Sequence, residues 1–295
     1  MAAAEVSPDH SSDPAWPVQD GVLDLGDLPA ERGGTIAGAR LVWQAHGTLN
    51  DARDNVIVYP CSYTASHEDL AWLIGPDGVL DPGRWFIVVP DMFSNGLSSS
   101  AADTADYPAV VTMADNVRAQ YRLLTEQFGV ARVAASYGFS MGAGQAYHWA
   151  ALYPEFVERA IVVCGSARTS AHNKVFLSGL LRTLEAAPEY QGNGQFSAEP
   201  LAAIKAFAHI YAAWGLSQDF YRERLYETAL GAPDLAAFIK TDWEDSFGQQ
   251  RAANLYAQAV TWQEADISAN ELYSGDLALA LSSITARVLL VPSAT

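Results

Sequence analysis

Ser140 is the residue of this sequence whose surroundings most plainly predict chemistry. It lies in Gly138-Phe139-Ser140-Met141-Gly142, a G-x-S-x-G pattern. Residues 133–135 before the pattern predict a short buried strand, and residues 142–152 after it predict a helix that Pro154 ends. A strand, a tight turn and a helix form a nucleophile elbow, on which a serine hydroxyl is exposed. The pattern therefore predicts a nucleophile, and the alternative is a serine in an ordinary strand-to-helix loop.

A nucleophilic serine needs backbone donors that stabilise the oxyanion formed when it attacks a carbonyl group. The N–H group of Met141, directly after the serine, is the first candidate donor. The second donor is expected from the loop after a predicted strand at residues 56–59, where Ser62 is the first choice and Tyr63 the second. The predicted oxyanion hole is therefore Met141 with Ser62.

A serine hydroxyl also needs a base, which is usually a histidine held by a carboxylate. In a fold with this elbow the order along the chain is serine, then acid, then histidine. His67 lies a few residues past the oxyanion loop and could line the pocket, but it precedes Ser140. His148 follows the serine by eight residues on the same helix, about 12 Å along its axis, and cannot reach the hydroxyl. None of the six histidines occupies the expected place, and those not yet named are His10, His46, His172 and His209.

Strands and helices alternate along most of the chain. Apolar runs predict strands at residues 41–43, 56–59, 85–90, 160–164 and 287–291. Thr112 with Asp115 predicts a capped helix over residues 112–128, which Gly129 ends. This order implies an α/β fold, the α/β-hydrolase fold, in which helices flank a mostly parallel sheet.

Residues 173–280 interrupt this alternation and predict a helical lid insertion that covers the elbow and shapes a pocket. Ala-rich and aromatic-rich segments predict helices at residues 201–214, 217–230 and 251–263. Their Trp and Tyr side chains are expected to pack between helices rather than to contact a ligand. The domain is expected to span residues 21–295, after a disordered lead-in over residues 1–20.

Composition limits the classes of partner. The 295 residues include 17 basic and 34 acidic ones, a net charge of −17, which argues against a nucleic acid or an anionic membrane as partner. No apolar stretch approaches the 18 or so residues of a membrane span, and residues 1–20 lack the pattern of a secretory signal. Cys61 and Cys164 are expected to be buried and unpaired, and the histidines show no metal-ligand spacing. A cytoplasmic enzyme without a bound cofactor or metal is the expectation.

Three stretches of the sequence resemble the homoserine O-acetyltransferase family and its esterase-like relatives. Gly47-Thr48-Leu49-Asn50 with Asn55 is similar to a G-x-L-N…N entry, and residues 112–120 are similar to a T-x-x-D-x-V-x-A-Q helix. Residues 138–150 resemble a G-x-S-M-G-x-x-Q-A-x-x-W-A elbow. The resemblance implies acyl transfer through an acyl-enzyme on Ser140, with acetyl-CoA or another acyl-CoA as co-substrate and a small alcohol as acceptor.

The resemblance also implies features that this sequence does not contain. A lid arginine would bind the carboxylate of the acceptor, whereas the corresponding residues 199–205 offer Lys205 and no arginine. The family's Asp and His belong beyond Thr295, so the C-terminal part of the fold is expected to be missing and this form to be nearly inactive and prone to aggregate. Three functions remain open: an acyltransferase, an esterase in which water is the acceptor, and a truncated hydrolase-like chain that at most binds a ligand. A homodimer is compatible with each.

Overall fold

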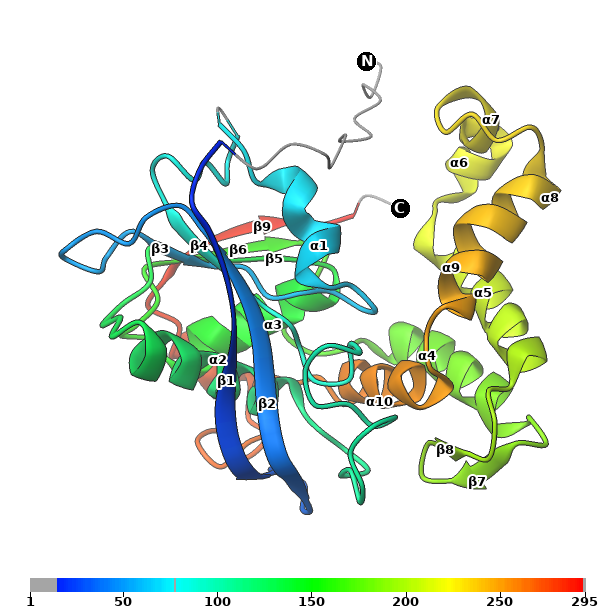
Figure 1. Ribbon diagram of the computed structural model, residues 1–295, viewed down its shortest axis with the longest axis horizontal. Helices are drawn as coiled ribbons and strands as arrows, with labels where there is room; N and C mark the ends of the chain where they lie inside the picture. Colours follow the sequence, from blue (N-terminus) through cyan, green and yellow to red (C-terminus); the bar gives the residue numbers. More distant parts are fainter. Residues whose placement is uncertain (1–14, 77, 294–295) are drawn as a thin grey trace.

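The central feature of the fold is a seven-stranded sheet in the order β1-β2-β4-β3-β5-β6-β9, seen in the computed structural model of residues 15–76 and 78–293 (Figure 1). The strands from β4 to β9 in this order run parallel, while β1 and β2 form an antiparallel hairpin that joins β4. The sheet is therefore mostly parallel, as predicted. The strands are β1 (Val18–Pro29), β2 (Thr35–His46), β3 (Val56–Val58), β4 (Phe86–Pro90), β5 (Ala135–Phe139), β6 (Arg159–Val163) and β9 (Arg287–Val291).

Helices cover both faces of this sheet because its inner strands are apolar on both sides. Val56 and Val58 of β3 pack in one core with residues of α2 (Met113–Arg122) and α3 (Met141–Leu152). Ile57 of β3 points to the opposite face, where it packs in a second core with Leu70 of α1 (His67–Leu70), the short helix that continues as a 3₁₀ turn over Ala71–Leu73. This alternation is the period of two expected of a strand that is buried on both faces.

Some predicted elements differ in their bounds. The strand predicted at residues 41–43 is part of the longer β2, which begins at Thr35 and ends at His46. The elbow strand begins at Ala135 instead of residue 133, because Val133 makes only an isolated bridge to Val157. The helix predicted over residues 112–128 consists of α2 and a wider π-helical turn over Leu123–Gln127. Its predicted cap is confirmed, since the Thr112 side chain accepts a hydrogen bond from the Asp115 N–H group and the Asp115 carboxylate accepts one from Thr112.

The hairpin of β1 and β2 differs more from the sequence-based expectation. β1 begins at Val18, so residues 18–20 form part of a strand, whereas a disordered lead-in was expected there. Residues 1–14 of that lead-in lie outside the described residues. Only Leu25 of β1 is buried, so this strand lacks the apolar run that marks the inner strands.

The segment between β6 and β9 is largely helical. The predicted helix at residues 201–214 is α5, the one at 251–263 is α10, and the one at 217–230 is two short helices, α6 and α7. In Figure 1 the helices α5 to α9 gather on the right, with α4 and α10 between them and the sheet. The elements are α4 (Ala171–Glu185), a small hairpin of β7 (Tyr190–Gly192) and β8 (Gln195–Phe196), α5 (Leu201–Gly215), α6 (Gln218–Arg222), α7 (Leu225–Thr228), α8 (Leu235–Phe238), a π-helical turn (Ile239–Glu244), α9 (Asp245–Gly248), α10 (Ala252–Gln263) and α11 (Leu277–Ser282).

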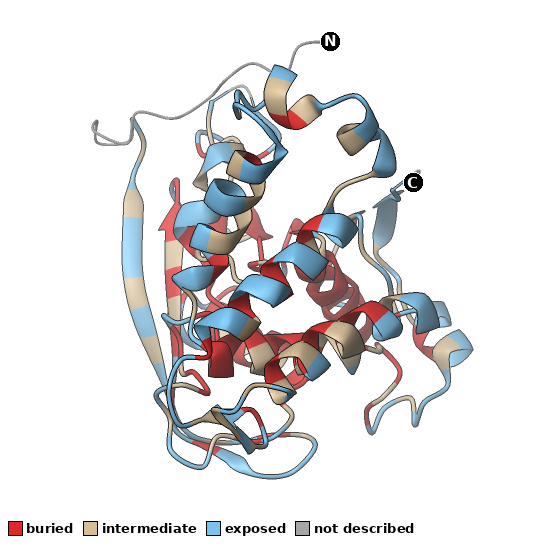
Figure 2. Ribbon diagram, turned by 90° about the vertical axis from the view of Figure 1, so that its right-hand side faces the viewer, coloured by how far each residue is buried: buried red, intermediate tan, exposed pale blue. Residues whose placement is uncertain are grey.

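These helices bury their inner faces in a core that they share with Tyr63, Met92, Met113 and Met141, and they leave their outer faces exposed (Figure 2). Several aromatic side chains expected to pack between helices do so; Tyr211 and Trp243, for example, pack against that core. Trp214 is 38% exposed and stacks on Phe176 at its border. Across the described part of the chain, no helix is both long and apolar enough to cross a bilayer.

Candidate active site

Ser140 sits at the junction of β5 and α3 in a backbone conformation that serine rarely adopts. Its φ is 53° and its ψ is −120°, so it lies on the positive-φ side, where a side chain crowds its own backbone at a cost of order 1–3 kcal/mol. Hydrogen bonds on both sides hold the turn: the Ser140 N–H group donates to the Val163 carbonyl oxygen (2.8 Å), and the Ser140 carbonyl oxygen accepts from Ala143 N–H (3.0 Å). The serine itself is half-buried.

The two glycines of the G-x-S-x-G pattern are required by close contacts of the backbone. A Cβ atom on Gly138 would lie 2.1 Å from the Gly142 carbonyl oxygen, and one on Gly142 would lie 2.5 Å from the carbonyl oxygen of Pro60. Both distances are far below a van der Waals contact. The second also shows that the loop after β3 lies directly against the first turn of α3.

Unpaired backbone donors lie at this contact. Within the described residues no hydrogen bond uses the N–H group of Met141, which is the first residue of α3, or the N–H groups of Ser62 and Tyr63 in the loop after β3. The N-terminus of a helix also carries a partial positive charge. The structure thus brings the sequence-predicted residues Met141, Ser62 and Ser140 to one edge of the sheet, the carboxyl ends of β3 and β5.

The side chain of Tyr63, the second choice for a donor, is directed into the helical segment. Its hydroxyl donates to the carbonyl oxygen of Leu255 in α10 (2.7 Å), and its ring stacks on Phe207 and Tyr211 of α5. The oxyanion loop is therefore anchored between the sheet and the helices that follow β6.

None of the histidines within the described ranges is hydrogen-bonded to Ser140, and each has a contact elsewhere. His46 accepts from the Trp16 indole, and the ring of His148 is hydrogen-bonded to the Gly144 carbonyl oxygen inside α3. His172 packs edge-on against Trp214, and His209 pairs with Glu244. Among the described residues no hydrogen bond involves the Ser140 hydroxyl, so the expected acid and histidine beyond Thr295 stay a prediction.

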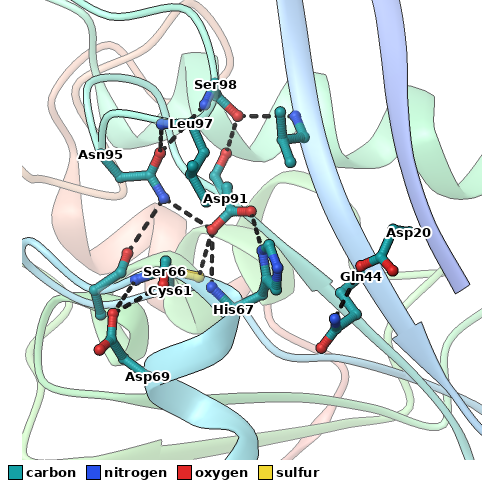
Figure 3. A network of polar contacts seen from close by, with 12 residues as sticks. Asp20, Gln44, Cys61, Ser66, His67, Asp69, Asp91, Asn95, Leu97 and Ser98 are labelled. Atoms are coloured by element: carbon teal, nitrogen blue, oxygen red, sulfur yellow. Dashed lines mark hydrogen bonds and ion pairs between the residues drawn. The ribbon is translucent and has the colours of Figure 1, made fainter. Parts of the chain in front are cut away.

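His67 makes a short polar contact with Asp91 near the end of the oxyanion loop. Its Nδ1 atom lies 2.6 Å from Oδ2 of Asp91, and its backbone N–H donates to Oδ1 of the same carboxylate (2.9 Å). The carboxylate also accepts from Asn95 and from the Cys61 thiol (Figure 3). The hydrogen bond to Asp91 raises the pKa of His67 above its ordinary value, although burial opposes this. Burial, together with the Asp91 charge, raises the pKa of the Cys61 thiol well above its ordinary range.

The sequence did not predict that His67 and Asp91 contact each other, and Asp91 was not among the candidate residues. Asp91 directly follows the apolar strand β4, and the carboxyl end of a parallel strand is where functional side chains gather. That signal could have marked Asp91, but nothing local pairs it with a residue 24 positions away. The pair binds α1, and with it the end of the oxyanion loop, to β4.

The structure also bears on two further expectations from the sequence, those for Lys205 and for the two cysteines. Lys205, which occupies the place expected for a carboxylate-binding arginine, pairs with Glu244 (3.5 Å). Cys61 is buried as expected, but Cys164 is exposed, because it follows the last residue of β6 with a φ of 55° in the turn that leaves the sheet. Within the described ranges no His, Cys, Asp and Glu side chains gather into a group that could hold a metal ion.

Comparison with known proteins places this geometry in a family. The profile of the alpha/beta hydrolase fold family matches residues 64–273. An ethyl acetate hydrolase of Pseudomonas veronii is 34% identical over 92% of this chain and 79% of its own length. The chain therefore belongs to the α/β-hydrolase fold family.

Within that family the relatives include both esterases and acyltransferases. The crystal structure of an acetylester hydrolase from Corynebacterium glutamicum has a TM-score of 0.87 and 32% identity, covering 93% of this chain and 80% of that one. A homoserine O-succinyltransferase of Paraburkholderia xenovorans is 28% identical over 91% of this chain and 80% of its own length. The chain thus belongs to a family of enzymes, and it is more similar to these esterases than to this homoserine acyltransferase. The sequence motifs alone favour the acyltransferase function over the esterase function.

Proposed function

We propose that this protein is a serine esterase that hydrolyses carboxylic esters with a short acyl group, such as acetyl esters. The observation that carries the proposal is the strained elbow, which exposes Ser140 beside the unpaired N–H group of Met141. The short acyl group is supported by the printed activities of the relatives, an ethyl acetate hydrolase and an acetylester hydrolase.

The proposed reaction has two steps, each a transfer of the acyl group. The Ser140 Oγ attacks the ester carbonyl carbon, a base takes the hydroxyl proton, and the N–H groups of Met141 and Ser62 donate to the oxyanion. The carbon–oxygen bond to the alcohol breaks, and the alcohol leaves with a proton. Water then attacks the acyl-enzyme, which releases the carboxylic acid and restores the serine.

Transfer of the acyl group from an acyl-CoA to an alcohol is the second candidate function, because it needs the same elbow. One observation weighs against homoserine as the acceptor. To bind the carboxylate of homoserine, a cation must be free of other partners. The Lys205 ammonium group instead pairs with Glu244, which is also hydrogen-bonded to His209. Water as the acceptor requires no such cation.

A direct assay separates the two functions. The intact gene product is supplied with p-nitrophenyl acetate or acetyl-CoA, each with and without homoserine. Ester cleavage that does not depend on homoserine is the expected result. Release of CoA that depends on the acceptor, at a rate above ester cleavage, would instead establish transfer.

A further inference from the structure

A chain of three hydrogen bonds joins the elbow helix to the oxyanion loop. The Trp149 indole N–H donates to Oε1 of Gln120 (2.8 Å), and Nε2 of Gln120 donates to Oε1 of Gln145 (2.7 Å). Nε2 of Gln145 then donates to the carbonyl oxygen of Cys61 (2.8 Å). The three side chains are fully buried. We call this chain of contacts the glutamine relay.

The indole sets the direction of the glutamine relay. An amide side chain can turn over and exchange its oxygen for its NH₂ group, but an indole N–H can only donate. The atom of Gln120 that faces Trp149 must therefore be the oxygen, which turns its NH₂ group toward Gln145. The same reasoning turns the oxygen of Gln145 toward Gln120 and its NH₂ group toward Cys61.

The relay ends on the peptide group that carries a proposed oxyanion donor. The carbonyl of Cys61 and the N–H of Ser62 belong to one planar trans peptide, so they point in opposite directions. A donor that holds the Cys61 carbonyl therefore also sets the direction of the Ser62 N–H group, which has no other hydrogen bond among the described residues. Met141, the other proposed donor, begins α3, the helix that carries Gln145.

We propose that Gln145, with Gln120 and Trp149 behind it, is a positioning residue for the oxyanion hole. This inference rests on the proposed function, because it gives the Ser62 N–H group a role in stabilising the oxyanion. The relay holds both donors in a fixed relation, one as the first residue of α3 and one through the amide of Gln145. The side chains of the relay do not touch the substrate.

The test replaces Gln145 by methionine, which has a similar length but cannot donate to Cys61. In Gln145→Met of the intact gene product the kcat for p-nitrophenyl acetate should fall roughly 10- to 100-fold, somewhat less than the loss of a whole oxyanion donor, while KM changes little. Trp149→Phe should cause a smaller decrease in kcat. Without the indole, the amide of Gln120 can exchange its oxygen and NH₂ positions, but Gln145 keeps its hydrogen bond to the Cys61 carbonyl oxygen. The rate at which a fluorophosphonate modifies Ser140 should fall in the same order.

Asn116→Leu is the matched control for the loss of a buried amide. Asn116 is fully buried on α2, one turn before Gln120, and its amide bonds Phe93 and Thr112 rather than the oxyanion loop. This variant should lose thermal stability comparable to Gln145→Met but keep its kcat. Equal decreases of kcat in both variants, in proportion to stability, would show that Gln145 only supports the fold.

Two measurements, ester cleavage and the rate of fluorophosphonate modification, test this inference separately from the proposed function. A wild-type protein that reacts with the fluorophosphonate but cleaves no ester would contradict the proposed function, while the modification rates would still test the relay. If Gln145→Met is modified at Ser140 as fast as the wild type, the positioning role is overturned.

Discussion

Ser140 is held in an unfavourable conformation by contacts that its neighbours cannot relax. The turn is bonded to β6 through Val163, and the close approach of Gly138 to Gly142 leaves no room for another path of the chain. A serine in an ordinary loop would not need such support. The conformation therefore argues for the hydroxyl as the reacting group and against the loop alternative.

Ser140 should be the single site of covalent modification by an active-site reagent. A fluorophosphonate reacts with a serine that faces an oxyanion hole, and among the described residues only Ser140 lies in an elbow directly before a helix. Mass spectrometry of peptides from the treated intact gene product should place the adduct on Ser140, and Ser140→Ala in that protein should lower kcat on the order of 10⁶-fold. An adduct on a different serine would remove Ser140 from the mechanism.

The His67–Asp91 pair should make the free energy of unfolding depend on pH. The pKa of His67 is raised in the folded protein above its ordinary value of 6.5, chiefly by the hydrogen bond to Asp91. The stability that the charged pair provides is therefore fully present below pH 6.5 and is lost as the pH rises through the raised value. Urea unfolding of the wild type and of His67→Gln should differ most at the acidic end and converge at high pH.

An exposed histidine provides the control for this measurement. His209→Gln removes a half-exposed ring that pairs with Glu244 in the helical segment, so it should change the free energy of unfolding little at any pH. A difference between wild type and His67→Gln that stays constant from acid to alkaline pH would show that the ring stabilises the fold by packing alone.

Among the elements, β5, α3 and the loop after β3 form one tightly packed unit. A methyl group on Gly142 would lie 2.5 Å from the Pro60 carbonyl oxygen, so Gly142→Ala must push the oxyanion loop away from α3. We expect this variant to lose about 1–3 kcal/mol of stability and to lose most of its esterase activity. Chemical unfolding and ester cleavage measure the two effects.

Gly179→Ala is the matched comparison for Gly142→Ala. Gly179 lies inside α4, and a Cβ atom there would have no neighbour within 4 Å. Alanine is a better helix former than glycine, so this variant should gain about 0.5–1 kcal/mol and keep its activity. A similar loss in both variants would mean that the contact with Pro60 is not the cause.

The sequence predicted those elements best whose signal lies within a few neighbouring residues. The elbow helix, the strands β3, β4, β6 and β9 and the Thr112 cap each depend on a local pattern, and all were placed within one residue of their observed bounds. The strand β1 was not predicted because eleven of its twelve residues are partly or fully exposed, with only Leu25 buried. A strand of this kind is stabilised by pairing with β2, which no local pattern reveals.

The candidate site was predicted only in part, for the same reason. Ser140, Met141 and Ser62 follow from the elbow and from the order of the strands. The glutamine relay joins residues from three separate parts of the chain, and the His67–Asp91 pair spans 24 positions. Gln120, Gln145 and Trp149 carried the family resemblance as letters in a motif, but only the folded chain shows that they contact one another.

The protein as a whole has one apolar edge that its own described residues leave uncovered. β9 pairs with β6 on one side, and its side chains Val288, Leu289, Leu290 and Val291 are each 42–57% exposed (Figure 2). An exposed apolar edge strand is a template on which another chain can pair. We therefore expect the 295-residue chain to self-associate at micromolar concentration.

A charge on this edge should reduce the association. Leu290→Lys places a solvated ammonium group on β9, and light scattering should show a smaller average mass than for the wild type. Val175→Lys adds the same charge at an exposed position of α4 and should leave the mass unchanged. Association that persists equally in both variants would place the contact elsewhere.

The unequal surroundings of the two cysteines give this protein a site for attaching a spectroscopic reporter. Of the two thiols, Cys61 is enclosed against Asp91, whereas Cys164 is open to solvent at the end of β6. The next residue, Gly165, packs against the first turn of α3, since a Cβ atom there would lie 2.3 Å from that of Ala143. A maleimide dye should therefore label the unmodified sequence at one position, one residue from that contact, and its fluorescence could follow acylation of Ser140 in real time.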